Sequence, residues 1–285
     1  MNYQWYPGHM TKAKRMMEEN IKLIDLVIEI VDARIPISSR NPDIDSLAVN
    51  KARIILLNKS DLADDKITNQ WINYFNENNI YCLKLNSRNN SGIKQVNGLI
   101  MTACADKIER NKQRGILNRP IRAMVVGIPN VGKSTFINSY AGKASAKTGN
   151  KPGVTKGKQW IKLNKNVELL DTPGILWPKF ESQDVGIKLS ICGSIKDEIV
   201  DLHMVCLHAL RIIEKKYPSL LEKRYGISID EFSGDKDGMG IATLIAQKRG
   251  CLLKGNQYDY ERVFTLVMND IRSNRIGAMT FESAN

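Results

Sequence analysis

Eight residues, "GIPNVGKS" at 127–134, could hold the phosphates of a nucleotide. They fit the pattern G-x-x-x-x-G-K-[S/T], whose glycines let backbone N–H groups close on phosphate oxygens. In this pattern Lys133 reaches the outer phosphates and the Ser134 hydroxyl ligates Mg²⁺. An apolar run precedes the motif and a helical pattern follows it, which is the context in which the motif binds phosphate. The other predicted nucleotide contacts of this loop are Asn130, Val131, Gly132 and Thr135.

A second motif, "DTPG", begins at Asp171 and ends another apolar run. Asp171 can hold a Mg²⁺-bound water, and the N–H of Gly174 can meet the terminal phosphate. The tetrapeptide alone is a common turn, but 37 residues after the end of a phosphate loop it is a specific signal. The segment 142–158 between the two motifs is long enough to act as a switch. Within it, Thr155 is placed to add a second Mg²⁺ ligand, and Thr148 is the alternative.

The stretch "NKSD", which starts at Asn58, follows a third apolar run and could recognise guanine. The Asp61 carboxylate can accept from both N1–H and N2–H of guanine, while Asn58 meets O6 and N7 and Lys59 lies along the ring. Adenine presents the wrong pattern, and a site built on such buried hydrogen bonds discriminates by about 10⁴ or more. The "NSR" that follows the next apolar run, Asn86, Ser87 and Arg88, could offer a backbone N–H to the guanine oxygen, and Asn86 and Ser87 are predicted to bind the nucleotide. Together the four motifs predict a GTPase.

The order of these motifs is unusual, because the guanine loop precedes the phosphate loop. No second N-K-x-D occurs in the 111 residues after Gly174. A parallel sheet tolerates moved chain ends if strand neighbours are kept and the cut falls in a surface connection. We therefore predict a circularly permuted G domain. Since the chain after "DTPG" continues away from the sheet, we also expect nucleotide-driven movement at 171–178 to reorient residues 179–285.

Apolar runs alternate with helical patterns over the first part of the chain, which predicts an α/β doubly wound, mostly parallel sheet. After Pro178 long helical patterns dominate. We predict a permuted P-loop GTPase domain at 1–178 and an all-helical domain at 179–285. The expected strands lie at 25–33, 52–60, 80–87 and 121–129, and two more, joined by a tight turn, lie within 159–174. The expected helices of the first domain lie at 64–78, 91–112 and 133–141.

The net charge of +12 arises entirely from the predicted first domain. Residues 1–178 contain 27 Lys and Arg against 15 Asp and Glu, whereas residues 179–285 contain 15 of each. The basic residues cluster at 143–165, with seven lysines and no acid, and at 107–122. Such clusters favour a polyanionic partner, most simply nucleic acid, although a single cluster could equally be a solvated face.

The 285 residues have a globular composition, with 42% hydrophobic residues, and no apolar run has the length of a membrane span. The N-terminal residues lack the basic-then-apolar order of a signal peptide. The five cysteines are scattered without any C-x-x-C, so we expect reduced thiols rather than a zinc site. We therefore predict a cytoplasmic protein with no membrane partner.

The chain resembles the ribosome biogenesis GTPase A (RbgA/YlqF) family of circularly permuted bacterial GTPases. The resemblance rests on "WYPGHMTKA", "DARIP", "NKSDL", "GIPNVGKST", "PGVTKG", "LLDTPGILWPKFE", "GSIKDEI" and "RSNRIGAMTFE", and it extends over essentially the whole chain. It implies a GTPase that binds the precursor of the large (50S) ribosomal subunit in its GTP state, acts late in assembly and is stimulated by the particle. It also implies that the helical domain contacts ribosomal RNA. Because that domain is neutral, the basic segment 143–165 is at least as good a candidate. We expect a monomer.

The residue that catalyses hydrolysis is not evident from the motifs. Ras-like enzymes orient the attacking water with a Gln directly after D-x-x-G, whereas this chain has Ile175. His203 and His208 lie in a helical, partly apolar stretch and are expected to be structural. The resemblance places a water-positioning histidine at His9, in "YPGHM". Asn130 could bind K⁺ beside the phosphates, where the ion would neutralise developing charge as an arginine finger does.

Two other functions remain compatible with the motifs. One is a GTPase in another RNA-linked process, such as RNA modification, for which residues 179–285 offer no obvious catalytic module. The other is an RNA-binding scaffold with a weak nucleotide site, which the intact Lys133, Ser134, Asp171 and Asp61 argue against. GTP turnover and binding to ribosomal subunits would distinguish the three.

Overall fold

The computed structural model describes residues 15–117, 119–142, 159–163, 165–171, 182–232 and 237–284. The chain forms two compact units, and the last four residues belong to the first of them although the second precedes them in the chain. The first unit comprises residues 1–181 and 282–285, and the second residues 182–281. The predicted boundary at 178 and the segment 172–178 expected to move lie outside the described residues, so both stay predictions.

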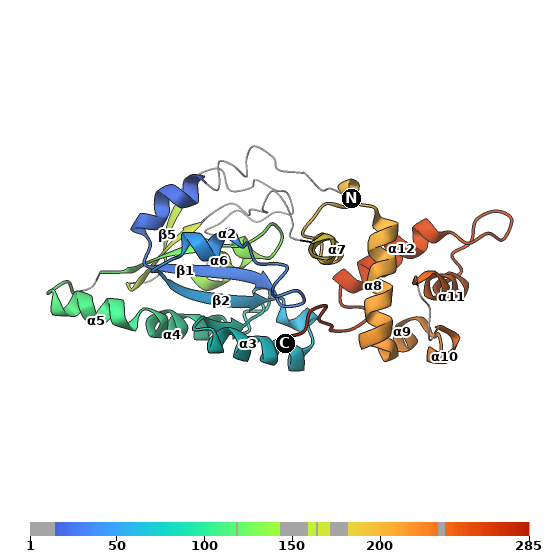
Figure 1. The fold of residues 1–285 in the computed structure, drawn as a ribbon, viewed down its shortest axis with the longest axis horizontal. Helices are drawn as coiled ribbons and strands as arrows, with labels where there is room; N and C mark the ends of the chain where they lie inside the picture. The colour runs from blue at the N-terminus through green and yellow to red at the C-terminus, as the bar shows by residue number, and fades with distance from the viewer. Residues whose placement is uncertain are drawn as a thin grey trace. The chain divides into compact units, whose positions relative to one another are not determined.

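The first unit is built on a six-stranded sheet with the strand order β3-β2-β1-β4-β6-β5 (Figure 1). Neighbouring strands are parallel except β5 and β6, which pair antiparallel as a hairpin. This mixed, mostly parallel sheet confirms the predicted fold class. The strands are β1 (Leu26–Asp32), β2 (Ala52–Asn58), β3 (Tyr81–Lys84), β4 (Ile121–Val126), β5 (Gln159–Lys162) and β6 (Val167–Asp171).

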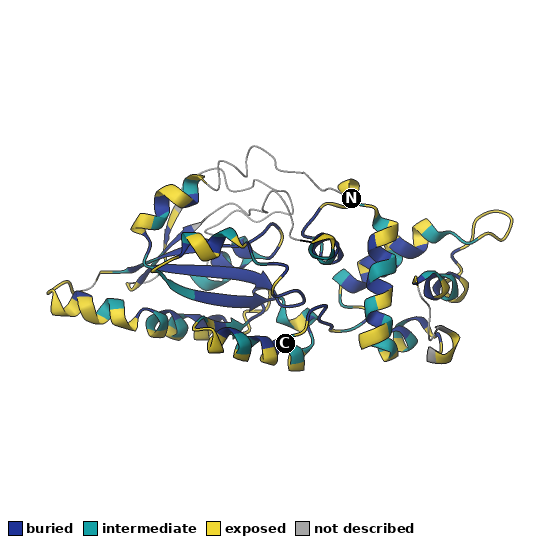
Figure 2. Cartoon of the chain, in the orientation of Figure 1, coloured by how far each residue is buried: buried dark blue, intermediate teal, exposed yellow. Residues whose placement is uncertain are grey.

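The central strands are buried because helices cover the sheet (Figure 2). Every residue of β1 is buried, as expected for a near-continuous apolar strand in a parallel sheet. Against one face, Trp71 and Phe75 of α3 pack on Val31 and Leu57. The predicted helix at 91–112 is interrupted at Cys104, where α4 ends and α5 begins. The helices are α2 (Asp43–Leu47), α3 (Asp65–Glu77), α4 (Ile93–Ala103), α5 (Ala105–Gln113) and α6 (Lys133–Ala141).

The second unit is helical, as predicted, and its described residues contain no strand beyond one isolated bridge between Leu252 and Tyr258. The helical stretch at 203–226 is divided at Tyr217, because Pro218 starts a new helix at the position that proline favours. Its helices are α7 (Gln183–Ile191), α8 (Leu202–Lys216), α9 (Pro218–Tyr225), α10 (Ile229–Phe232), α11 (Met239–Arg249) and α12 (Tyr260–Arg272).

The ends of the helices in this unit are fixed by polar contacts. Asp201 and Asp259 cap α8 and α12 by accepting from backbone N–H groups of the first turn. At the other end of α12, Arg272 binds Asp197 with two nitrogens and donates to the carbonyl oxygens that end α7. The core of this unit is therefore closed by specific contacts and not by apolar burial alone.

Two further expectations concern the cysteines and the membrane. All five cysteines are buried free thiols, in agreement with the expectation of reduced cysteines. None of the described helices is both long enough and apolar enough to span a bilayer.

Candidate nucleotide-binding site

The strand order brings the guanine loop and the phosphate loop to one edge of the sheet. The guanine loop follows β2 and the phosphate loop follows β4, while β1 lies between these strands and is parallel to both. Because carboxyl ends of parallel strands share an edge, both loops project from that edge. Asp32, the last residue of β1, is in register with Asn58 and therefore lies between the loops.

The phosphate loop has the tight geometry that its glycines predict. Gly127 has a φ of 153°, and a Cβ there would lie 2.5 Å from the carbonyl oxygen of Ile30 in β1. Lys133 is only 8% exposed, and its Nζ donates to the carbonyl oxygens of Gly127 at 3.1 Å and Ile128 at 3.2 Å. The loop thus fixes the ammonium group, and Lys133 itself is the first residue of α6, whose N-terminus favours negative charge.

Asn58 joins the guanine loop to the phosphate loop. Its Nδ2 donates to the carbonyl oxygen of Val131 at 2.8 Å, across 73 residues of sequence. Its Oδ1 accepts from the backbone N–H of Ser87 at 3.1 Å and from the Ser87 hydroxyl at 2.9 Å. The side chain is 3% exposed, so its amide group has few other partners within reach. For the predicted contact of Asn58 with guanine, only the second hydrogen on Nδ2 is left to donate. The role of Asn58 in joining the two loops was not predicted.

Gly132 is required by this tether. Its φ is 100°, and a Cβ there would lie 2.3 Å from the Nδ2 atom of Asn58. Any side chain at position 132 would therefore push the guanine loop away from the phosphate loop. The glycine of the phosphate motif consequently serves both phosphate approach and contact between the loops.

The "NSR" segment is held in place by the same network. Besides its two bonds to Asn58, Ser87 accepts from the Ser139 hydroxyl of α6 at its carbonyl oxygen, at 2.5 Å. The N–H of Asn86 donates to the carbonyl oxygen of Ser91 at 3.0 Å. Both backbone N–H groups predicted to meet the guanine oxygen therefore donate within the protein. Asn86 and Ser87 thus help to shape the site, and their predicted contact with the guanine oxygen stays a prediction.

Lys59 is fixed by a carboxylate that the motif analysis missed. Its Nζ donates to Asp32 Oδ2 at 2.8 Å, and its backbone is left-handed with a φ of 58°. Arg34 binds the same carboxylate through Nε at 2.9 Å and Nη2 at 2.8 Å. Burial alone would raise the pKa of Asp32, but the two cations outweigh it and hold that pKa well below its usual value. Asp32 is therefore a fixed negative charge, 0% exposed, beside the guanine loop.

A signal for Asp32 was present in the sequence. Asp32 is the first residue of "DARIP", a segment that was noted only for its resemblance to a family. An acidic residue at the end of a buried strand that lies between two nucleotide loops is itself a candidate for a functional role.

The remaining predicted residues are placed only in part. Asp61 is exposed in a short 3-10 turn, η2 (Ser60–Leu62), directly after Lys59. Asp171 ends β6 in register with Val125 of β4, so its backbone lies beside the start of the phosphate loop. The positions of His9, Thr148, Thr155 and Gly174 and the side chain of Asp171 lie outside the described residues.

The residues present fit a nucleotide-bound Mg²⁺. Ser134 is the second residue of α6, beside Lys133, and Asp171 ends the adjacent strand. Hydroxyl and carboxylate oxygens are ligands that Mg²⁺ prefers, and the ion usually keeps several waters and phosphate oxygens. In the described ranges no three His, Cys, Asp or Glu side chains are grouped as a metal cluster. Asn130, proposed to bind K⁺, is exposed in the same loop with a left-handed φ of 60°, which asparagine adopts readily.

The two histidines expected to be structural make contacts of that kind. His203 packs against Phe264 with a centroid distance of 4.7 Å and lies 3.2 Å from a Glu261 oxygen. His208 lies 3.5 Å from Asp184, and burial lowers its pKa although that carboxylate opposes the shift. Both residues are within the helical unit.

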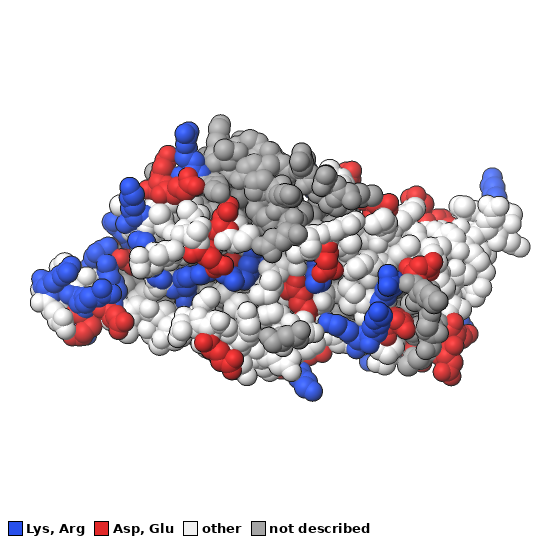
Figure 3. All heavy atoms as spheres, in the orientation of Figure 1, with Lys and Arg blue, Asp and Glu red and all other residues white. Residues whose placement is uncertain are grey.

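The basic cluster at 107–122 is partly neutralised. Lys107 and Arg119 lie 3.5 and 3.3 Å from Asp25, and Arg122 lies 3.7 Å from Glu168. Basic side chains nevertheless gather over α5 on the face shown in Figure 3. Three of them, Arg110, Lys112 and Arg114, are exposed. A polyanion could therefore contact the end of α5 rather than the whole cluster.

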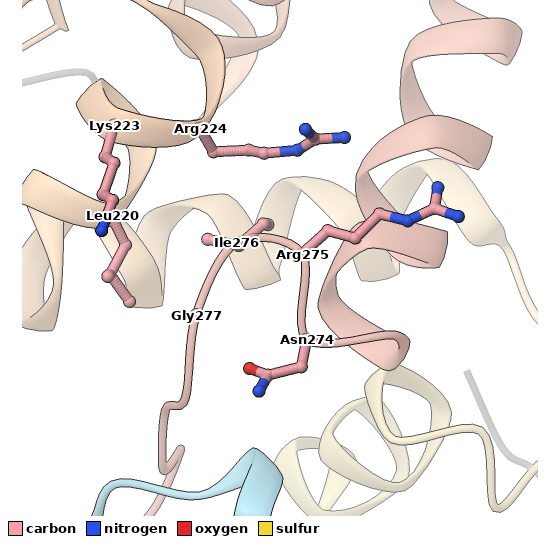
Figure 4. Close-up of a pocket in the computed structure, with 7 residues that line it drawn as sticks. All are labelled: Leu220, Lys223, Arg224, Asn274, Arg275, Ile276 and Gly277. Atoms are coloured by element: carbon pink, nitrogen blue, oxygen red, sulfur yellow. The ribbon is translucent and has the colours of Figure 1, made fainter.

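A second basic feature lies in the helical unit, where a pocket of about 350 Å³ opens between α9 and the segment after α12 (Figure 4). Its charged lining residues are Lys223, Arg224 and Arg275. Arg224 is neutralised by the buried Asp270, with bonds of 2.8 and 3.1 Å. Lys223 and Arg275 are exposed, and Arg275 also lies 3.5 Å from Asp270, so Lys223 and the outer part of Arg275 are the charges that this pocket presents to solvent.

Comparison with known proteins relates the whole chain to one family. The sequence profile described as "50S ribosome-binding GTPase" matches residues 122–228. Ribosome biogenesis GTPase A of Bacillus cereus is 48% identical over 283 residues, which cover 99% of this chain and 94% of the relative. The protein of the same name from Thermotoga maritima is 34% identical over 280 residues, covering 98% of this chain and 93% of that one.

Two solved structures have the same fold. GDP-bound TM YlqF is 29% identical with a TM-score of 0.64, covering 94% of this chain and 99% of that one. GNP-bound YlqF from T. maritima is 30% identical with a TM-score of 0.61, covering 96% of this chain and 99% of that one. The similarity therefore includes both structural units.

Proposed function

The chain belongs to the ribosome biogenesis GTPase A family, and from this premise we propose that it is a GTP-hydrolysing switch for late assembly of the large ribosomal subunit. It is a GTPase of the circularly permuted YlqF type. In its GTP state it binds the precursor particle, and hydrolysis stimulated by that particle releases it. Two observations support this cycle. Relatives of the chain are named for ribosome biogenesis, and similar YlqF structures are described as GDP-bound and GNP-bound.

The observation that carries this proposal is the contact of Asn58 with Val131 and Ser87. A guanine loop and a phosphate loop from distant parts of the chain are bonded directly to each other. Such a contact fixes the distance between base and phosphate sites, so one nucleotide can bridge them. A scaffold with a degenerate nucleotide site would not need this tether.

The residues of the site divide the work of hydrolysis. Lys133 and the N–H groups at the start of α6 bind the outer phosphates and offset the charge that develops on them. Ser134 and Asp171 are the residues that would hold Mg²⁺, with Thr155 as a proposed third ligand, and the ion would supply positive charge beside the phosphates. Asp61 and Lys59 hold the base. The attacking water is oriented by a residue from outside these loops, because Ile175 cannot hydrogen-bond to it.

We expect His9→Ala to bind GTP with unchanged affinity but to lose most of its particle-stimulated turnover. Positioned general bases and water-orienting groups contribute roughly 10²–10⁴-fold to rate, so the loss should be about 100-fold. Turnover is measured with immature large subunits, and affinity with a fluorescent GTP analogue. Wild-type turnover in this variant would remove His9 from the mechanism.

The same turnover assay, run in sodium and in potassium buffers, examines the ion proposed at Asn130. Faster hydrolysis in potassium is expected, since the cation would neutralise charge beside the phosphates. Equal rates in both buffers would argue against the ion.

The proposed particle contacts are the basic segment 143–165, the end of α5 and the pocket beside α9. We expect the protein to co-sediment with immature large subunits in the presence of a non-hydrolysable GTP analogue and to dissociate with GDP. Equal sedimentation in both nucleotide states would contradict the proposed switch.

Lys223→Ala combined with Arg275→Ala should weaken co-sedimentation severalfold and reduce its salt dependence, because each phosphate contact releases counterions.

A further inference from the structure

We propose that the C-terminal tail, residues 282–284, is a structural part of the guanine site, and that Glu282 is a positioning residue for Lys59. This inference rests on the proposed function, because it adds a residue to the same site. The tail follows the helical unit directly in the chain but belongs to the first unit. The tail contacts the loop 33–41, this loop contacts Asp32, and Asp32 positions Lys59, which holds the base.

The loop 33–41 follows β1 and has no regular secondary structure, and most of its residues are buried although Ile37 is exposed. Ile35 and Ser39 are 0% exposed and Ser38 is 3% exposed. Backbone N–H groups in such a loop have no neighbouring strand to donate to, and a buried N–H without an acceptor is costly. The N–H groups of Ile35 and Ser39 donate to carbonyl oxygens of Asp32 and Ile35, whereas those of Ile37 and Ser38 take their acceptors from elsewhere in the protein.

Glu282 supplies these acceptors from the far end of the chain. Its Oε2 accepts from the N–H of Ile37 at 2.7 Å, and its Oε1 accepts from the N–H of Ser38 at 3.1 Å. The Ser38 hydroxyl also donates to Oε1. The carboxylate belongs to a residue only 8% exposed, and charged acceptors on backbone N–H groups make stronger hydrogen bonds than neutral ones.

The loop is in turn bonded to the guanine site. The hydroxyl of Ser39, the residue after Ser38, accepts from the N–H of Asp32 at 2.9 Å. On the other side of Asp32, the N–H of Ala33 donates to the carbonyl oxygen of Asn58 at 2.9 Å. The Asp32 carboxylate then holds Lys59 at 2.8 Å. Consecutive residues of one buried loop thus connect Glu282 with both Asn58 and Lys59.

The tail has its own anchor on this unit. Trp71 Nε1 donates to the carbonyl oxygen of Glu282 at 3.5 Å, and Ala284 packs against the apolar cluster that contains Trp71 and Phe75. The chain end accordingly lies beside α3 (Figure 1). These contacts hold the Glu282 backbone, so its carboxylate is presented to the loop in one place.

Lys59 is sensitive to this support. A non-glycine residue in the left-handed region, such as Lys59 at a φ of 58°, is held there by its surroundings and not by its own preference. The ion pair with Asp32 is the described contact that fixes its ammonium group. If the loop after β1 loosens, Asp32 shifts and Lys59 loses its position along the base.

The test compares wild type, Glu282→Ala and a control, Glu77→Ala, whose glutamate is exposed on α3. Dissociation of a fluorescent GDP should be about tenfold faster in Glu282→Ala, equivalent to ~1.4 kcal/mol, and unchanged in Glu77→Ala. Ser38→Ala removes one of the bonds to the same carboxylate and should show a smaller effect in the same direction. Inorganic tripolyphosphate, which occupies only the phosphate loop, should compete with equal strength in all four proteins.

Each outcome bears on the inference. Equal weakening of GDP and tripolyphosphate would show that Glu282 acts on general stability, and unchanged GDP dissociation in Glu282→Ala would show that the tail has no part in the site; either result overturns the proposal. If Glu282→Ala does not fold, Ser38→Ala decides in the same way. Failure of the wild type to bind GDP at all would instead reject the proposed function.

Discussion

Asp61→Asn should weaken GTP binding by about 100-fold or more. The amide oxygen of asparagine can still accept from one of the two guanine N–H groups, but without charge assistance, and its NH₂ group meets the other N–H donor to donor. Each charge-assisted hydrogen bond contributes ~1.5–3 kcal/mol, and here one is lost and the other weakened. The variant should at the same time gain affinity for xanthosine triphosphate. Xanthine carries an oxygen where guanine carries its amino group, and the asparagine amide can donate to that oxygen. Asp61 is exposed in the short turn that follows Lys59.

The dissociation constants of both nucleotides are measured by competition with a fluorescent GTP analogue. Asp65→Asn is a suitable control, since Asp65 is an exposed aspartate four residues away that pairs with Lys84. It should leave both constants unchanged. If Asp61→Asn bound GTP as tightly as wild type does, Asp61 would not be the residue that recognises guanine.

Asn58→Ala should weaken GTP binding tenfold to 100-fold and also lower the free energy of unfolding by ~2–4 kcal/mol. The substitution leaves the carbonyl oxygen of Val131 and the N–H of Ser87 without the partner that they have now. Since buried polar groups without partners are costly, stability falls. Since the guanine and phosphate loops are then no longer bonded through this side chain, both ends of the nucleotide lose affinity.

The two effects of Asn58→Ala are measured separately, by urea unfolding and by nucleotide titration at a temperature where the variant is folded. Ser87→Ala provides the matched comparison, because it removes the hydroxyl bond to Oδ1 and keeps the backbone bond. It should cost ~1 kcal/mol in stability and only a few-fold in affinity. Wild-type GTP affinity in Asn58→Ala would mean that the tether is unnecessary for binding.

The sheet could be predicted from the sequence because its strands are short apolar runs buried on both faces. The segments 25–33, 52–60 and 121–129 each contain an observed strand, and the predicted order of the loops follows from them. The break at Cys104 was missed, since no Gly or Pro marks it. The break at Tyr217 could have been predicted, because Pro218 cannot continue a helix.

The nucleotide motifs were predictable because their chemistry is local. Lys133 and Gly132 carry their roles in the spacing of a single loop. The bonds between loops were not predictable, since they join residues that are far apart in the chain. Asn58 was assigned to the base although its amide oxygen bonds Ser87, and Glu282 drew no attention because the loop that it supports lies 244 residues away. The positions of His9, Thr155 and Gly174 remain predictions.

The central claim is that the loop after β2 and the loop after β4 bind opposite ends of one GTP. A crystal structure with GDP and Mg²⁺ tests it most directly. The account predicts the guanine within hydrogen-bond distance of Asp61 Oδ1 and Oδ2, and the β-phosphate on the N–H groups of Gly132 to Ser134. A nucleotide whose phosphates occupy the phosphate loop while its base lies away from Asp61 would contradict the claim.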